Sequence, residues 1–346
     1  MKVKAGNVAI GGGAPVSVQT MTTTDTKNVE ATISQIRVLE EAGADIVRLA
    51  VPDLAAAESF AEIKKAVRVP LVCDIHFDYR IALRCIEAGA DKIRINPGNI
   101  GEAARVRKVA QAAKSAGVPI RIGVNGGSLE KEFYEKYGHT PRAMVESAKY
   151  HASLLEKEGF SDIVISLKAS DVQKTVEAYR LMAKEGNYPL HIGVTEAGTA
   201  YAGLIKSAVG IGSLLLDGIG DTIRVSLSAP PEEEVKAGIT LLRALGLRQG
   251  AQLISCPTCG RCKINLMPVA REMEEYLSKI ETPIRVAVMG CAVNGPGEAK
   301  EADVGIAGGD GKAVLFRHGE IVKSIGAEEI LPTLKTEVER IIKTWK

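Results

Sequence analysis

Three cysteines fall within the stretch "SCPTCGRC" at residues 255–262, and a fourth follows in "MGCAVNGPGE" at residues 289–298. Such a set can form disulfides, bind a structural zinc ion or ligate an iron–sulfur cluster. A structural zinc site usually combines two pairs of Cys or His ligands. Here Cys256 and Cys259 form one pair, whereas Cys291 stands alone with no histidine near it. A C-x₂-C pair with a remote thiolate also holds [4Fe–4S] clusters, so the spacing fits either metal centre.

Two ligand sets agree with this spacing. In the first, Cys262 joins the other three cysteines and the site is closed by four thiolates. In the second, Cys262 stands apart and Glu298, which lies beyond the turn "NGPG", takes the fourth place. A carboxylate is a harder and weaker partner for iron than a thiolate, so it could give way to a substrate oxygen. The spacing alone does not choose between the two sets.

Composition narrows the class of protein. The N-terminal stretch "MKVKAGNVAIGGGAP" has no apolar core typical of a signal peptide, and no run reaches the length of a membrane span. We therefore expect a cytoplasmic protein with no membrane partner, in which thiols stay reduced and disulfides are disfavoured. A net charge of +2 and an aromatic content of 4% argue against nucleic-acid binding.

Basic residues interrupt apolar runs that otherwise resemble buried strands. Four arginines each lie between two aliphatic residues, and a lysine ends a similar run: Arg48, Arg94, Arg121, Arg224 and Lys168. Other polar residues occupy the same segments: Asp74, His76, Asn96, Asn125, Glu196 and Ser226. One arginine could simply pair with an acid and seal the interior. Five cations with only Asp74 and Glu196 as counter-charges instead indicate a site for an anion with several oxygens, and a diphosphate ester fits best.

The loops "NPGNIG" (96–101) and "VNGGS" (124–128) add glycines where backbone N–H groups can approach such an anion. His76 lies near the end of its apolar run, which favours a role in the site. His139, His151 and His318 lie in helical or loop contexts, and we expect them at the surface.

These residues need elements that bring them together. Eight short runs rich in β-branched residues predict strands at 16–21, 46–52, 71–77, 92–98, 120–127, 163–170, 190–198 and 222–228. Helical patterns separate them, and the phrase "EAGAD" twice closes a helix before a strand. Eight strand–helix units predict a (β/α)₈ TIM barrel, whose site lies at the carboxyl ends of its strands. A doubly wound sheet is disfavoured because no early G-x-G-x-x-G follows a strand.

A second, smaller α/β domain should follow the barrel. The last barrel helix is expected at 231–245, and "GLRQGAQ" (246–252) is typical of a linker. We predict a barrel domain over 1–246 and a cysteine domain over 247–346. The latter should contain helices near 265–279 and 327–343, and strands near 284–290, 303–306, 312–317 and 320–324.

Taken together, the motifs resemble the 4-hydroxy-3-methylbut-2-enyl diphosphate synthases of the methylerythritol phosphate route to isoprenoids, in their short two-domain bacterial form. The resemblance runs nearly end to end. It is carried by "SVQTMTTTDT" (17–26), "DIHFDYRIAL" (74–83), "KIRINPGNIG" (92–101), "RIGVNGGSLE" (121–130), "GVTEAGT" (193–199), "CPTCGR" (256–261) and "GCAVNGPGEA" (290–299).

The resemblance implies reductive ring opening and dehydroxylation of 2-C-methyl-D-erythritol 2,4-cyclodiphosphate, with electrons from ferredoxin or flavodoxin. It implies a [4Fe–4S] cluster bound by Cys256, Cys259, Cys291 and Glu298, which leaves Cys262 as a spare. It implies that the diphosphate is bound by Arg48, Arg94, Asn96, Arg121, Asn125, Lys168, Arg224 and Ser226. It also places His76, Thr195 and Glu196 beside the carbon skeleton, with Glu196 as a candidate proton donor.

The fold adds an expectation about assembly. Each barrel helix returns the chain to the face opposite the active site, so the cysteine domain begins at the wrong end for its own barrel. A linker of about ten residues spans at most ~35 Å. We therefore expect a homodimer in which each cysteine domain faces the partner's barrel, as the resemblance also implies.

Two other functions fit the same residues. A hydro-lyase with an open iron would need no electron donor. A non-enzymatic module, stabilised by a metal and binding a phosphorylated metabolite, would need no reaction at all.

Overall fold

Short β-branched runs form a parallel sheet that nearly closes on itself. The structure is a computed structural model that describes residues 1–291 and 299–345, divided into the units Met1–Leu247 and Arg248–Lys346. The strands of the first unit are β3 (Ser17–Met21), β4 (Ile46–Ala50), β5 (Leu71–Asp74), β6 (Lys92–Arg94), β7 (Ile120–Asn125), β8 (Ile163–Lys168), β9 (His191–Ile192) and β10 (Thr222–Ile223). Their order is β8-β7-β6-β5-β4-β3-β10-β9, and a parallel bridge between Ile165 and Leu190 joins its two ends. All eight predicted barrel strands are confirmed.

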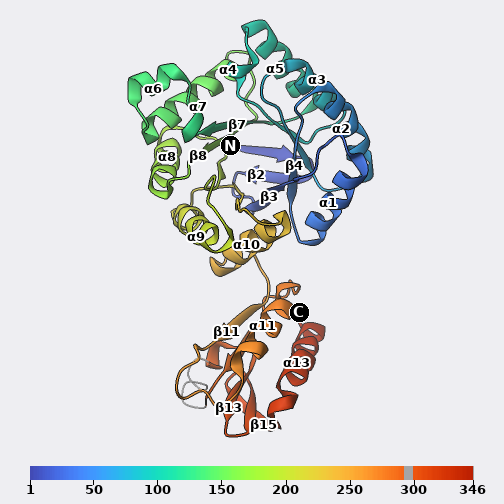
Figure 1. The fold of residues 1–346 in the computed structure, drawn as a ribbon, viewed down its shortest axis with the longest axis vertical. Coiled ribbons are helices and arrows are strands. Elements are labelled where there is room, and N and C mark those ends of the chain that lie inside the picture. The colour runs from blue at the N-terminus through green and yellow to red at the C-terminus, as the bar shows by residue number, and fades with distance from the viewer. Residues whose placement is uncertain (292–298, 346) are drawn as a thin grey trace. The chain divides into compact units, whose positions relative to one another are not determined.

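Helices surround this sheet (Figure 1). The long ones are α1 (Val29–Glu41), α2 (Leu54–Ala66), α3 (Tyr79–Glu87), α5 (Ala103–Ala116), α7 (Pro141–Glu156), α8 (Val172–Glu185), α9 (Ala200–Leu216) and α10 (Pro231–Ala244). Two short helices, α4 (Pro97–Ile100) and α6 (Lys131–Tyr137), and a 3₁₀ turn (Gly126–Ser128) lie in loops after β6 and β7. Side chains cap several helices, as Asp53 does by accepting the N–H of Ala56 at 2.8 Å.

The repeated "EAGAD" phrase has a physical explanation. In both copies the glycine follows the helix in a left-handed conformation, with φ of 96° at Gly43 and 86° at Gly89. The aspartate then accepts a backbone N–H from the neighbouring strand. Asp45 bonds the N–H of Val18, and Asp91 that of Leu71, both at 2.7 Å. The phrase therefore ends a helix and fixes the start of the adjacent strand.

The two faces of the barrel strands differ in chemistry. Outward side chains such as Val47, Leu49 and Ile93 pack in one apolar core with the helices. Inward side chains near the amino ends of the strands are mainly apolar. There an unpredicted hairpin, β1 (Lys2–Ala5) and β2 (Val8–Gly11), packs against the barrel through Val3, Ala5, Ile10, Ile46, Val72 and Val164. The rest of the interior is therefore left to the polar residues that alternate with the outer core.

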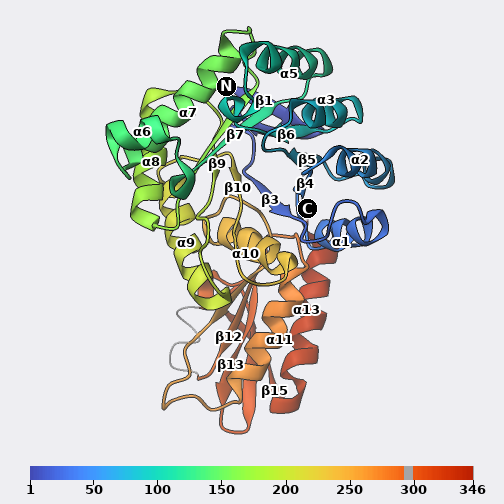
Figure 2. The same ribbon diagram turned by 45° about the horizontal axis from the view of Figure 1, so that its top comes forward.

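The second unit is a mixed sheet with helices. Its strands are β11 (Gln252–Ser255), β12 (Arg285–Met289), β13 (Val304–Gly309), β14 (Lys312–Arg317) and β15 (Glu320–Gly326). Strands β11, β12 and β13 are parallel, and β14 and β15 continue the sheet antiparallel. Two 3₁₀ turns (Ala299–Glu301, Ala327–Glu329) accompany the helices α11 (Leu266–Ser278) and α13 (Ile330–Thr344), which share an apolar core with the sheet (Figure 2). The small α/β domain is confirmed. Strand β11 was not predicted; it begins at the last residue of the expected linker, 246–252.

The described helices include none that is both long enough and apolar enough to span a membrane.

Candidate active site

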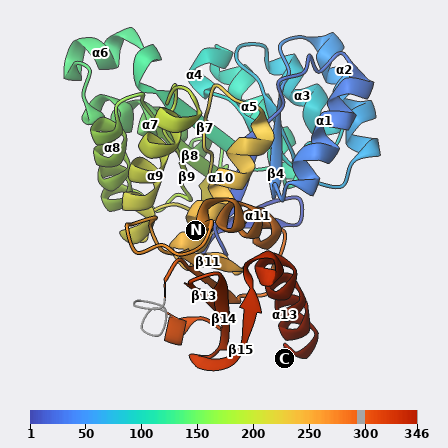
Figure 3. The same ribbon diagram turned by 60° about the horizontal axis from the view of Figure 1, so that its bottom comes forward.

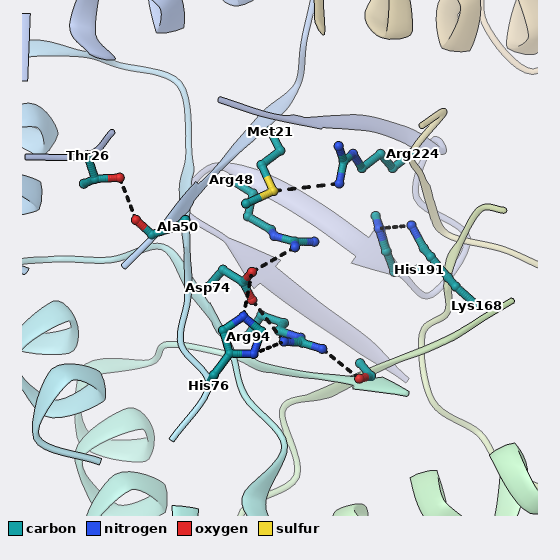
Figure 4. A network of polar contacts seen from close by, with 11 residues as sticks. Met21, Thr26, Arg48, Ala50, Asp74, His76, Arg94, Lys168, His191 and Arg224 are labelled. Carbon is teal, nitrogen blue, oxygen red and sulfur yellow. Dashed lines mark hydrogen bonds and ion pairs between the residues drawn. The ribbon is translucent and has the colours of Figure 1, made fainter. Parts of the chain in front are cut away.

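Four side chains from three neighbouring strands form one network at the carboxyl end of the barrel (Figure 4). Asp74, which ends β5, lies between Arg48 of β4 at 2.9 Å and Arg94 of β6 at 3.3 Å. His76 follows on the same segment, with its Nδ1 3.1 Å from Arg94 Nη1. Burial alone would raise the pKa of Asp74, but Arg48, His76 and Arg94 together hold it well below its usual range. Asp74 is therefore a carboxylate that fixes two arginines and His76.

Deeper in the barrel, several buried donors have no acceptor. Arg121 of β7 is 2% exposed, and its Nε and Nη2 atoms make no hydrogen bond to the described residues. The same holds for Nζ of Lys92 and for both side-chain polar atoms of Gln19. Burial, and then Arg48 and Arg94, lower the pKa of Arg121 from its ordinary value. An unsatisfied buried donor costs about 1–3 kcal/mol, so this interior suits a ligand rich in acceptor oxygens.

Two glycines make room for the cations. Both follow an isoleucine and precede a valine, in "IGV" at 122–124 and again at 192–194. A Cβ at Gly123 would lie 2.7 Å from Arg94 Nε, and a Cβ at Gly193 would lie 2.9 Å from Lys168 Nζ. Any larger residue at either position would push a cation out of place.

On the opposite wall, Lys168 and Arg224 occupy different settings. Lys168 Nζ lies 3.2 Å from Nε2 of His191, a fully buried histidine. Arg224 lies 3.5 Å from Glu234, a residue of the first turn of α10. Glu234 also accepts hydrogen bonds from the Thr20 hydroxyl at 3.1 Å and the Leu227 N–H at 2.9 Å. The counter-charge of Arg224 is thus Glu234 and not Glu196.

Charge in the described interior is strongly unbalanced. The basic side chains that converge there are Arg48, Lys92, Arg94, Arg121, Lys168 and Arg224. Within the described part of the barrel, only Asp74 and Glu234 pair with them. This excess favours an anion with more than one negative charge.

A cavity of about 370 Å³ lies beside the cationic cluster, over the loops that follow β7, β8 and β9. Its lining includes three predicted site residues: Asn125, Thr195 and Glu196. Glu196 is exposed and has a φ of +52°, a conformation that costs energy for a residue with a Cβ. Asn96 is not part of this lining; its side-chain oxygen accepts the Gly123 N–H at 3.0 Å. Ser226 is half-buried just after β10.

In the second unit, the cysteines gather at the carboxyl ends of two paired strands. Cys256 follows β11, and Cys291 follows β12 after Gly290, whose N–H donates to Cys256 Sγ at 3.1 Å. Cys259 is exposed in the turn that leads to Cys262. No three Cys, His, Asp or Glu side chains in the described ranges lie close enough to hold one metal ion. Glu298 lies outside the described residues.

The donor chemistry nevertheless fits an iron–sulfur cluster better than it fits oxygen-seeking metals. The thiols share one end of the sheet, and a backbone N–H to sulfur is a contact that tunes such clusters. Cys262 differs from the others. Its thiol donates to the Ile264 carbonyl at 3.2 Å, and a Cβ at Gly290 would lie 2.6 Å from its sulfur. Cys262 is thus already packed and hydrogen-bonded.

Sequence reasoning missed four residues of the barrel site. Lys92 could have been found, because it lies two residues before Arg94 and strand side chains alternate with period two. Gln19, His191 and Glu234 carry no comparable signal, since their positions depend on strand register and on how α10 packs.

The expectation that His151 lies at the surface was wrong. His151 is fully buried, and both of its ring nitrogens have partners: Nδ1 accepts the Gly98 N–H at 3.0 Å, and Nε2 lies 2.5 Å from Glu130.

Comparison with known proteins agrees with this architecture. Residues 1–239 match the family model described as "GcpE TIM-barrel domain", and residues 252–340 match "GcpE protein C-terminal domain". The chain is 59% identical over 344 residues to the 4-hydroxy-3-methylbut-2-en-1-yl diphosphate synthase (flavodoxin) of Caldanaerobacter subterraneus subsp. tengcongensis, covering 99% of this chain and 97% of that protein. It is 58% identical to the protein of the same name from Geobacter sulfurreducens, over 99% and 97% of the two chains.

Solved structures of other enzymes share the barrel alone. Dihydropteroate synthases from Stenotrophomonas maltophilia and Yersinia pestis superpose with TM-scores of 0.51 and 0.52 at 15% and 13% identity. They cover 71% and 72% of this chain, and 97% and 100% of their own chains are matched. At such low identity they support the fold and nothing more. With both of its domains matched in order and relatives this similar over nearly their full length, the chain belongs to the GcpE family.

Proposed function

We propose that this protein converts 2-C-methyl-D-erythritol 2,4-cyclodiphosphate into (E)-4-hydroxy-3-methylbut-2-enyl diphosphate, a two-electron reduction that opens the ring and removes a hydroxyl. The observation that carries the proposal is the unbalanced barrel interior, where buried donors such as Arg121 lack acceptors. A cyclic diphosphate supplies both the charge and the oxygens that this interior lacks. The names of the relatives support the same reaction.

In this proposal the barrel, residues 1–246, binds the substrate. Arg48, Arg94, Arg121, Lys168 and Arg224 contact the diphosphate, with Asn96, Asn125 and Ser226 at its edge. His76 is held by Asp74 and Arg94 and faces the carbon skeleton together with Thr195. Glu196 is exposed at the adjacent cavity and delivers a proton to the departing hydroxyl.

Residues 247–346 hold the cofactor in this proposal. Cys256, Cys259, Cys291 and Glu298 bind a [4Fe–4S] cluster, which supplies electrons one at a time when it is present. Flavodoxin is the electron donor suggested by the relatives' names, and ferredoxin is the alternative. A cytoplasmic location, which the sequence predicts, would keep these thiols reduced and available for the cluster.

Cys262 tests this ligand set. Its thiol already donates a hydrogen bond to the Ile264 carbonyl, so Cys262→Ser should retain about four irons per chain, the content of one cluster. Cys256→Ser should lose them. Loss of iron in the Cys262 variant would favour the closed four-thiolate set.

The reaction itself is tested with anaerobically purified protein, the cyclodiphosphate and reduced flavodoxin, with the product identified by mass spectrometry. Product should form only with the reductant, and Glu196→Gln should abolish turnover while substrate still binds. Release of product without any reductant would instead identify a hydro-lyase. Binding without any turnover would identify a binding module.

A further inference from the structure

The amine of Lys168 lies in a setting that is unusual for a lysine. Lys168 ends β8, only 7% of the residue is exposed, and its Nζ lies 3.2 Å from His191 Nε2 (Figure 4). Among the described residues, no carboxylate lies within ion-pair distance of this amine. Its neighbours include the buried imidazole of His191 and Gly193, where a Cβ would lie 2.9 Å from the amine. Glu234 favours the ammonium form from a greater distance, but its influence is weaker than that of the surrounding cations.

The surrounding cations oppose the ammonium form of Lys168. Burial, and then the positive charges of Arg224 and Arg121, hold the pKa of Lys168 well below that of an exposed lysine. A lysine that is desolvated and surrounded by cations keeps a useful fraction of free amine, which is the nucleophilic form. Lys168 is the last residue of β8, at the carboxyl end of the strand and next to residues that line a cavity. Ala169, the next residue, and Asn125, the register partner of Lys168, both line the cavity of about 370 Å³.

We propose that Lys168 condenses reversibly with small phosphorylated aldehydes, which makes the barrel mouth a site of covalent inhibition. The arginines bind the phosphate and thereby bring the aldehyde carbon to the amine. The nitrogen lone pair adds to the carbonyl carbon, the carbinolamine loses one water, and an imine remains. No oxidant or reductant is consumed, and hydrolysis returns both partners. The adduct occupies the place of the diphosphate, so aldehyde and substrate compete.

Lys92 cannot take this role although its amine is also unpaired. It is fully buried, two residues deeper than Arg94 on the same strand, and its neighbour Val72 belongs to the apolar layer beneath. An aldehyde would have to pass Arg94 and Arg121 to reach it. The proposal therefore assigns the chemistry to Lys168 alone among the lysines of the barrel interior.

Pyridoxal 5′-phosphate is a suitable probe, and pyridoxal is its matched control without the phosphate. The full-length protein is titrated with each compound, the imine absorbance is followed, and borohydride then fixes the adduct for peptide mass spectrometry. We expect one fixed adduct, on Lys168, and an affinity for the phosphorylated probe at least about tenfold higher, equivalent to ~1.4 kcal/mol. Inorganic pyrophosphate should protect the site.

Variants complete the test. Lys168→Arg keeps the charge and should lose the adduct, whereas Lys174→Met, at an exposed lysine that lines the neighbouring cavity, should label normally. Equal affinity for the two probes, or labelling spread over exposed lysines, would overturn the proposal. Peptide mapping of the wild type gives this answer even if Lys168→Arg does not fold. The assay needs neither cluster nor electron donor, so its outcome is independent of the proposed reaction.

Discussion

At the scale of single residues, Arg94 and Arg121 show how one side-chain type can serve two purposes. They are register partners on β6 and β7, and both point into the barrel. Arg94 is compensated by Asp74 and donates to the Gly123 carbonyl at 2.9 Å. Arg121 has no carboxylate partner among the described residues and keeps two nitrogens without acceptors. Arg94 therefore stabilises the fold of the barrel, whereas Arg121 keeps donors that the proposed substrate would engage.

Substitution by methionine should separate these two roles. Replacing buried charges by well-packed apolar side chains is often neutral or stabilises a protein by about 1–4 kcal/mol, whereas removing one partner of a buried ion pair destabilises it by about 3–5 kcal/mol. Arg121→Met should therefore raise the free energy of unfolding of the ligand-free protein, and Arg94→Met should lower it. Both should weaken binding of the cyclodiphosphate at least about tenfold. Urea unfolding and calorimetric titration check this, and a destabilised Arg121→Met protein would contradict it.

The sequence reveals the arginines of the barrel interior better than it reveals their acidic partners. An arginine between two aliphatic residues stands out in any strand, so Arg48, Arg94, Arg121 and Arg224 were all predictable. Their partners were not equally visible. Asp74 is on a strand and was found, but Glu234 is on a helix and reaches Arg224 only because α10 packs beside β3 and β10. Charge balance is therefore decided by tertiary packing.

At the scale of elements, a buried hydrogen-bonded chain joins the loops after β6 and β7 to α7. His151 Nδ1 accepts the Gly98 N–H, so its Nε2 carries the proton and donates to Glu130. Ser147 donates to the other oxygen of Glu130 at 2.7 Å. The two loops begin at Asn96 and Asn125, both proposed substrate contacts. These hydrogen bonds of His151, Glu130 and Ser147 thus hold the two glycine-rich loops in place. The sequence identified these loops only by their composition.

Glu130→Gln tests this positioning through pH. Burial would raise the pKa of Glu130, but hydrogen bonds from His151 and Ser147 outweigh it and lower the pKa from 4.5 to about 2. A lowered carboxyl pKa stabilises the fold above the unfolded pKa, and this stabilisation is lost as pH falls towards the folded one. At pH 7 the variant should be less stable by about 1–2 kcal/mol and should have a raised KM.

The difference between wild type and Glu130→Gln should shrink as pH falls from 5 towards about 2. Urea unfolding at several pH values measures this, with the exposed neighbour Glu132→Gln as the control. A stability difference that stays constant with pH, or an unchanged KM, would show that the hydrogen bonds of Glu130 do not position the loops.

Elements were predictable where local and tertiary signals agree. β-Branched runs between amphipathic helices give the eight barrel strands, because each must be buried on its outer face. The β1–β2 hairpin was missed since its strands have only four residues each, and β1 alternates lysine with apolar residues. Its assignment depends on the apolar layer of the barrel that it covers, which only the fold reveals.

At the scale of the whole molecule, α9 presents an apolar face to solvent. It lies on the outer wall of the barrel between α8 and α10 (Figures 1 and 3). Its exposed side chains include Tyr201, Leu204, Ile205, Val209 and Leu216, at exposures from 40% to 81%. Monomeric proteins rarely leave such a stripe uncovered, which supports the homodimer that the sequence predicts.

Charges on this face should break the dimer. We expect Ile205→Glu combined with Val209→Glu to yield a folded monomer, because two buried carboxylates without partners would oppose association. Lys65→Glu on α2 changes an exposed residue on another helix of the barrel and should leave the dimer intact. Analytical ultracentrifugation distinguishes the two states. A double variant that remains dimeric would show that another surface holds the subunits together.

Mixed dimers test whether each cysteine domain serves the partner's barrel. Glu196→Gln inactivates the proposed proton donor, and Cys256→Ser removes a proposed cluster ligand, so each variant alone should be inactive. Co-expressed, they should regain about a quarter of the wild-type rate, since about half of the dimers pair unlike chains and each of these has one intact site. No recovery would mean that barrel and cluster of the same chain work together.

In the proposed enzyme a cationic barrel and an iron–sulfur centre act on the same substrate, and EPR spectroscopy of the cluster tests this coupling. Anaerobically purified protein is reduced and its EPR spectrum recorded with and without the cyclodiphosphate, beside iron, sulfide and zinc contents. We predict about four irons per chain and a spectrum that changes with substrate. Arg121→Met should keep the iron and lose the change. Zinc in place of iron, or a wild-type cluster signal that substrate does not change, would show that the barrel and the cysteine domain do not act together in this reaction.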